Sequence, residues 1–128
     1  MFVGDIMPMK IAPDVHDLVS ELFDTADIVL ANIESPVTFR NPKKQGKGCC
    51  NSSVGDITFD MPLSYLSDLF KNCKIFPRKA ILNIANNHAG DEGESGLMKT
   101  IENLESLGAT VVCKFLNLLC FLIVVTID

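Results

Sequence analysis

The clearest sign of the fold is the sequence KAILNIANNHAGDEGESGLMKTIENLESLGATVVC, at residues 79–113. It opens with the apolar run KAILNIA, passes through a polar turn and continues as ESGLMKTIENLESLG, where apolar residues recur at helical spacing. Gly108 is expected to cap the end of this helix, and ATVVC is a second apolar run. A strand, a helix and a strand in this order predict two parallel strands joined by a crossover helix. The helical residues expected to face inward are Leu97, Ile101, Leu104 and Leu107.

The same alternation of apolar runs and helical patterns extends toward the N-terminus. Residues 1–5 predict a strand that ends in Asp5, and the continuous apolar run at 26–32 is typical of a strand buried on both faces. Two helices are expected, at 13–24 with one buried apolar face and at 61–72. The predicted fold class is therefore α/β, with a parallel-rich sheet, flanking helices and right-handed crossovers. We expect Asp14 to cap the first helix and Pro62 to lie in the first turn of the second. His16 is expected at the surface, and residues 36–60 are expected to form a loop.

Composition excludes some classes of function. The 128 residues suggest one domain or a piece of one, and a net charge of −5 argues against nucleic acid as the main partner. The basic residues gathered at 40–48 are interrupted by proline and glycine, which indicates a solvated loop. The five cysteines match no zinc-site spacing, so we expect them to serve packing.

The two ends of the chain bear on its location. The first predicted strand begins directly after Met1, so we expect no signal peptide. The apolar run at 115–127 is shorter than the ~20 residues of a membrane-spanning helix, and its β-branched end favours a buried strand over a membrane segment. We expect a domain at 1–112, a separate apolar segment at 113–128, no entry of this chain into a membrane, and a cytoplasmic location by default.

Polar side chains stand where three of the predicted strands end. Asp5 ends the first strand, and Asn32 and Glu34 end the second. The sequence Asn-Asn-His at 86–88 ends the third. In open parallel sheets the carboxyl ends of the strands meet at one edge, where ligands bind. We therefore expect these side chains to converge, with His88 among them.

Each of these residues also has a purely structural interpretation. Asp5 can open a turn, and Asn32 and Glu34 can cap a loop. The asparagines at 86–87 tolerate left-handed turn geometry, and His88 can bond to a carbonyl group. Polar residues at three successive strand ends nevertheless favour a functional site over three independent turns.

The residue types at this edge match metal chemistry. Carboxylates, amides and one imidazole form a mixed oxygen and nitrogen ligand set that suits Mn²⁺, Fe²⁺ or Zn²⁺. Phosphoester hydrolysis commonly uses two such ions about 3.5–4 Å apart. A cation would also offset the repulsion between Asp5 and Glu34, and a nearby histidine can protonate a leaving oxygen.

Three segments carry a resemblance to a known family: FVGDIM, ADIVLANIESPVT and LNIANNHAGDEGESGLMKTIENLESLGATVV, at residues 2–7, 26–38 and 82–112. They resemble successive motifs of the bacterial capsule synthesis protein CapA (PGA_cap) family, which is associated with poly-γ-glutamate capsule synthesis. The family resembles the calcineurin-like metallophosphoesterases in fold. The resemblance therefore implies the first half of a metallophosphoesterase-like α/β/β/α sandwich.

The resemblance also implies roles for individual residues. Asp5 would be the first metal-ligand carboxylate, and Glu34, with Asn32 beside it, would stand where the phosphoesterases place a metal-bridging carboxylate. Asn87 would be the metal-ligand asparagine of their Gly-Asn-His motif, and His88 would assist the leaving group. The implied cofactors are one or two divalent ions of manganese, iron or zinc. The implied substrate is an anionic polymer precursor or a phosphate ester.

The chain also departs from the phosphoesterase pattern. Asp5-Ile6-Met7 replaces their Asp-x-His, and the chain contains only His16 and His88, whereas they need further histidines from a C-terminal half. Two hypotheses follow. The chain is either a CapA-like metal-dependent enzyme domain, or a non-catalytic truncated fragment or interaction module that needs a partner chain. An unpaired sheet edge and an apolar tail would in the second case promote self-association.

Overall fold

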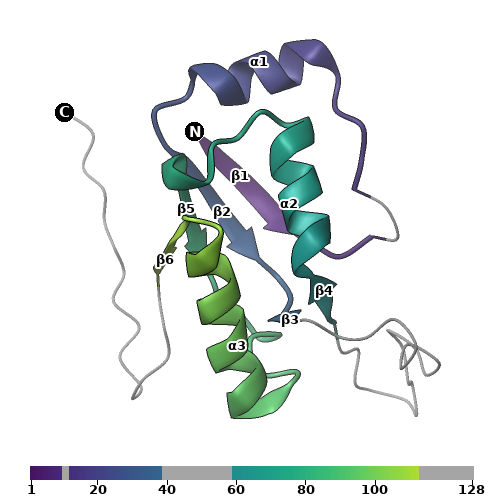
Figure 1. The fold of residues 1–128 in the computed structure, drawn as a ribbon, viewed down its shortest axis with the longest axis vertical. Helices are drawn as coiled ribbons and strands as arrows, with labels where there is room; N and C mark the ends of the chain where they lie inside the picture. Colours follow the sequence, from purple (N-terminus) through teal and green to yellow (C-terminus); the bar gives the residue numbers. More distant parts are fainter. Residues whose placement is uncertain (10–11, 39–58, 113–128) are drawn as a thin grey trace.

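The computed structural model describes residues 1–9, 12–38 and 59–112 of the chain. The apolar segment at 113–128, predicted to be a strand, lies outside these residues. No helix within them is long and apolar enough to span a membrane. The elements follow one another as β1 (Phe2–Ile6), α1 (Asp17–Thr25), β2 (Val29–Ile33), β3 (Val37–Thr38), β4 (Met61–Pro62), α2 (Leu63–Asn72), a short 3₁₀ helix (Pro77–Lys79), β5 (Ala80–Asn83), α3 (Gly93–Ser106) and β6 (Thr110–Val112) (Figure 1).

Four strands form a parallel sheet in the order β1-β2-β5-β6. Each of these strands is added beside the one before it in the chain, always on the same side of the growing sheet. Helices α2 and α3 both pack against the sheet in one common core, which is the arrangement that right-handed crossovers in one direction produce. The predicted α/β fold, a parallel sheet flanked by helices, is confirmed.

Burial alternates along β2, and β5 follows the same alternation. Val29, Ala31 and Ile33 are buried, whereas Leu30 and Asn32 are only half-buried. Within the described part of the chain, one face of the strand is packed tightly and the other is not. The prediction of burial on both faces is therefore wrong for these residues, because α2 and α3 pack against the same face of the sheet.

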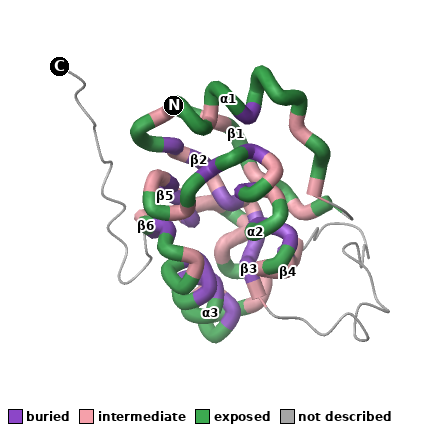
Figure 2. The backbone as a smooth tube through the Cα atoms, turned by 45° about the horizontal axis from the view of Figure 1, so that its top comes forward, coloured by how far each residue is buried: buried purple, intermediate pink, exposed green. Residues whose placement is uncertain are grey.

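Helix α1 differs most from its prediction. It begins after His16, whose Nδ1 accepts a hydrogen bond from the backbone N–H of Leu18 at 3.3 Å, so Asp14 is not the cap. His16 is exposed, as predicted. The side chains of Leu18 and Leu22 are 66% and 58% exposed, and most of α1 is exposed in Figure 2, although Phe23 packs against the core. The predicted buried face is largely open because α1 lies across the N-terminal ends of the strands (Figure 1).

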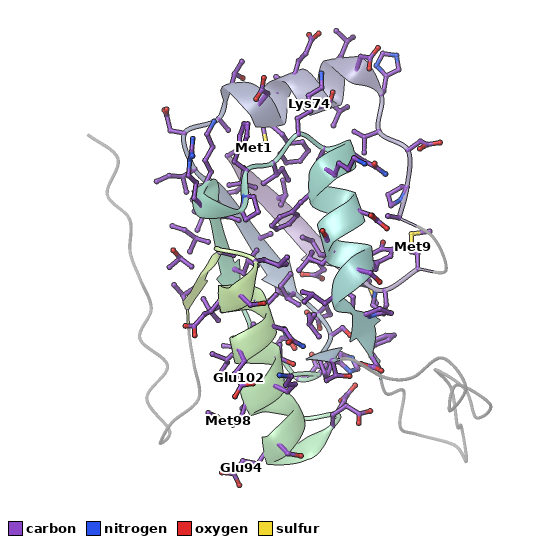
Figure 3. The ribbon with its side chains drawn as sticks, in the orientation of Figure 1. Met1, Met9, Lys74, Glu94, Met98 and Glu102 are labelled. Atoms are coloured by element: carbon purple, nitrogen blue, oxygen red, sulfur yellow. The ribbon has the colours of Figure 1, made fainter. Side chains whose placement is uncertain are left out.

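Helix α3 follows its prediction closely. Ile101 and Leu104 are buried, and the other two predicted inward residues pack against the core. Met98 and Glu102 project from the outer side of the helix, where Figure 3 labels them. Gly108 has a φ of 90°, the left-handed conformation in which glycine commonly ends a helix.

The segment predicted as loop contains the short β3, which pairs in parallel with β4 just beyond its end. Two residues are too few to produce a period-two pattern, so the sequence carries no signal for them. Side chains of α3 hold β3 in place: the backbone N–H of Val37 donates to Oγ1 of Thr100 at 2.8 Å, and Nδ2 of Asn103 donates to the carbonyl of Val37 at 2.8 Å. This contact anchors the chain just after Glu34.

The core lies between the covered face of the sheet and the helices. Cys73 is buried there as a free thiol, which agrees with the packing role predicted for it. The other four cysteines lie outside the described residues. The largest fully buried side chains are Ile33, Met61, Leu66, Leu82, Ile84 and Leu104.

Candidate functional site

The register of the sheet aligns polar residues at the carboxyl ends of three strands. Asp5 is paired with Asn32, and Asn32 with Asn83. Strand β1 has a register irregularity between Phe2 and Asp5. In a regular strand, residues three apart point to opposite faces, so an irregularity of this kind can bring Asp5 to the face of its neighbours.

The side chain of Asn32 is the centre of a hydrogen-bond network. Its Nδ2 donates to Oδ1 of Asp5 at 2.8 Å and also donates to Oε2 of Glu34. Its Oδ1 accepts from Nδ2 of Asn83 at 2.8 Å and from Nδ2 of Asn86 at 3.2 Å. Two carboxylates therefore accept hydrogen bonds from the amide nitrogen of Asn32. Two further amides donate hydrogen bonds to its amide oxygen.

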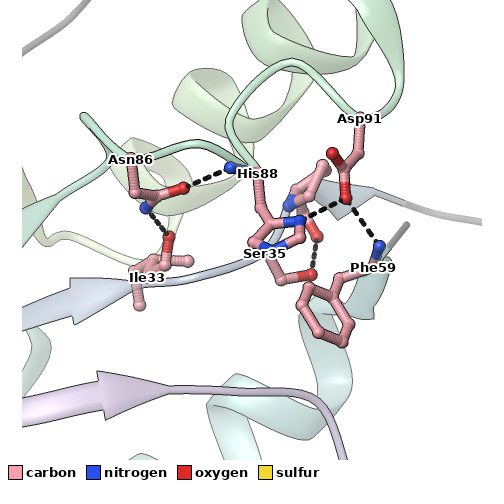
Figure 4. Close-up of polar contacts among 7 residues, drawn as sticks. Ile33, Ser35, Phe59, Asn86, His88 and Asp91 are labelled. Atoms are coloured by element: carbon pink, nitrogen blue, oxygen red, sulfur yellow. Dashed lines mark hydrogen bonds and ion pairs between the residues drawn. The ribbon is translucent and has the colours of Figure 1, made fainter. Parts of the chain in front are cut away.

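The turn after β5 is tied to this network through Asn86. Its Nδ2 also donates to the carbonyl of Ile33 at 2.7 Å, and its Oδ1 accepts from the backbone N–H of His88 at 3.0 Å (Figure 4). Asn86 is half-buried, whereas the neighbouring Asn87 is exposed. The turn thus places His88 beside the strand ends.

An acidic residue and an aromatic ring fix the orientation of the His88 ring. Nδ1 of His88 lies 2.9 Å from Oδ2 of Asp91, which also accepts from the backbone N–H of Phe59 at 2.7 Å (Figure 4). The rings of His88 and Phe59 meet edge to face, with centroids 4.3 Å apart. Because a carboxylate accepts hydrogen bonds, this pairing favours the tautomer with the proton on Nδ1, in which Nε2 is the ring atom left for proton exchange.

The structure joins most of the predicted site residues and leaves one apart. Asp5, Asn32 and Glu34 share one network, and His88 is attached to it through its backbone. Asn87, predicted to be a metal ligand, is exposed in the turn.

Two contributions to the site were missed or left open by the sequence. Asn83 has an amide that supports Asn32, but it stands in an apolar run and was not singled out. The feature that could have identified Asn83 is its position at the end of β5, where it is paired with Asn32. Asp91 stands in the turn after His88, and the structure pairs its Oδ2 with Nδ1 of His88 at 2.9 Å.

Comparison with known proteins gives the family. The model of the bacterial capsule synthesis protein PGA_cap family matches residues 1–113. The chain belongs to this family. A PGA_cap relative, the PGA biosynthesis protein CapA of Bacillus subtilis (strain 168), is 30% identical over 122 residues. The match covers 84% of this chain, which spans only 29% of the length of that relative.

The donor set of this PGA_cap chain fits a divalent cation in kind. The carboxylates of Asp5 and Glu34 both accept hydrogen bonds from Nδ2 of Asn32, which carries a partial positive charge. Carboxylate oxygens suit hard or borderline cations. The set is small, however. Within residues 1–9, 12–38 and 59–112, no group of three or more histidine, cysteine, aspartate or glutamate side chains could hold a metal ion.

Proposed function

We propose that this PGA_cap chain acts in the biosynthesis of an anionic capsule polymer of the poly-γ-glutamate type, through a phosphoesterase-like site that binds a divalent cation. The observation that carries the proposal is the convergence of Asp5 and Glu34 on one amide nitrogen at the carboxyl edge of the sheet. Two carboxylates at one point repel each other unless a positive group lies between them. The name of the Bacillus subtilis relative supports the polymer class.

Asp5 and Glu34 would hold the cation, with Asn32 and Asn87 as further candidates from the phosphoesterase pattern. Such a cation, of manganese, iron or zinc, would supply Lewis-acid activation of a phosphate ester or a related anionic precursor. His88 would deliver a proton from Nε2 to the leaving oxygen, because Asp91 occupies its Nδ1. The pairing with Asp91 would keep the ring in one orientation through the reaction.

Calorimetric titration with MnCl₂ tests the cation site. We expect the wild-type chain to bind Mn²⁺ and the Asp5→Ala variant to bind at least tenfold more weakly, because one of two carboxylate ligands is lost. Asp68→Ala is the matched control, since Asp68 is an exposed carboxylate on α2 and its removal changes the net charge equally. Indistinguishable isotherms for wild type and Asp5→Ala would refute the cation site.

The exposed apolar surface favours a second candidate function, an interaction module that works with a partner chain or a second copy. Leu18 and Leu22 on α1 and Phe2 on the edge strand β1 are all more than half exposed. Surfaces of this kind commonly mark contacts between proteins. A monomer by light scattering, together with phosphodiesterase turnover that His88→Ala abolishes, would refute this candidate.

A further inference from the structure

Backbone groups fix the orientation of the two supporting amides behind Asn32. The backbone N–H of Ala85 donates to Oδ1 of Asn83 at 3.3 Å, and that of His88 donates to Oδ1 of Asn86 at 3.0 Å. The carbonyl of Ile33 accepts from Nδ2 of Asn86 at 2.7 Å. A backbone N–H can only donate and a carbonyl can only accept, so each side-chain amide has one orientation that satisfies its neighbours.

These two amides in turn fix Asn32. Both direct their NH₂ groups at its Oδ1, so its own NH₂ group must face the carboxylates of Asp5 and Glu34. In the opposite orientation, Oδ1 of Asn32 would face the carboxylate oxygens of Asp5 and Glu34, and its NH₂ group would face the NH₂ groups of the two supporting amides. Both arrangements are repulsive. The polarity of the whole cluster therefore follows from backbone groups outside it.

We propose that Asn32 is a positioning residue, whose Nδ2 holds the Asp5 and Glu34 carboxylates together when no cation is bound and is displaced when a divalent cation binds to them. This inference rests on the proposed cation site. It differs from the ligand role that the family resemblance implies for Asn32, because the amide oxygen, the only atom of that side chain that can ligate a metal, is taken by two NH₂ donors.

The two roles predict opposite effects of removing the amide. As a positioning residue, Asn32 competes with the cation for the same carboxylate oxygens, and both of its charge-assisted hydrogen bonds are lost on binding. Asn32→Ala removes the competitor and leaves two unscreened carboxylates. We expect it to bind Mn²⁺ roughly tenfold more tightly than wild type. As a ligand, Asn32 would make the same variant bind more weakly.

Calorimetric titration of the 128-residue chain with MnCl₂ separates the two roles, with circular dichroism to verify folding. Asn72→Ala is the matched control, because Asn72 lies on α2 and its amide donates to the carbonyl of Pro13 on the exposed surface. Its affinity for Mn²⁺ should equal that of wild type. Weaker or unchanged binding by Asn32→Ala, with normal binding by wild type, would overturn this inference and leave the cation site standing. No binding by wild type would overturn both.

Asn32→Asp provides a second measurement should the alanine variant fail to fold. Three carboxylates would then meet without a cation, so we expect a lower thermal midpoint than wild type in EDTA and a larger rise on addition of Mn²⁺. An equal rise in wild type and variant would contradict the proposal, since it would mean that the group at this position does not compete with the cation.

Discussion

The anchoring of β3 by α3 can be tested with one nearly isosteric substitution, Thr100→Val. Val37 is fully buried, and its backbone N–H donates to the hydroxyl of Thr100, which is only 2% exposed. Valine preserves the shape of the side chain but leaves a buried N–H without an acceptor. The desolvation cost of such a group is about 1–3 kcal/mol, so we expect a loss of about that size in the free energy of unfolding. For a domain of this size each kcal/mol corresponds to roughly 2–8 °C in the melting temperature.

Urea denaturation followed by circular dichroism measures the loss. Thr110→Val is the matched control, because Thr110 is exposed on β6 and the same change should alter stability by less than about 0.5 kcal/mol. Asn103→Leu removes the donor to the carbonyl of Val37, and the double variant should lose less than the sum of both single losses, since one broken contact already loosens the strand. A Thr100→Val variant as stable as the control would refute the anchoring role.

Three further predictions concern the core, a helix start and alkaline stability. Leu82→Ala should lower the free energy of unfolding by about 2–5 kcal/mol in urea denaturation, since Leu82 is fully buried; a loss below 1 kcal/mol would contradict its burial. Gly96→Ala should also lower the free energy of unfolding in the same assay, because the new Cβ would lie 2.2 Å from Cβ of Glu92, although alanine favours helices. A gain in stability would contradict this prediction and show that the start of α3 can shift. Burial raises the pKa of the Cys73 thiol, and burial and the neighbouring Cys73 raise the pKa of Tyr65. The folded state therefore binds these protons more tightly than the unfolded state, so the free energy of unfolding should fall as the pH rises above the ordinary thiol pKa. Urea denaturation at a series of pH values from neutral to alkaline measures this fall, and Cys73→Ala should make it smaller. An equal fall in wild type and Cys73→Ala would contradict the role of Cys73.

The fold class, and the edge of the sheet where the candidate site lies, can be predicted from local sequence patterns. Apolar runs and helical spacing are local signals, and the α3 residues Ile101 and Leu104 are buried as their spacing predicts. The convergence of Asp5 with Asn32 also followed from strand order alone, because the carboxyl ends of parallel strands share an edge.

Which faces of the elements are covered, and how the site residues are hydrogen-bonded, depends on contacts between distant parts of the chain. The exposure of Leu18 on α1 depends on where the helix lies relative to the sheet, which spacing within the helix does not encode. The orientation of the Asn32 amide depends on Asn86, which lies in a turn more than fifty residues further along the chain. Asn86 is itself oriented by the backbone carbonyl of Ile33. Local patterns record which face of an element is apolar, whereas hydrogen-bond polarity and coverage arise from contacts between segments that are distant in the chain.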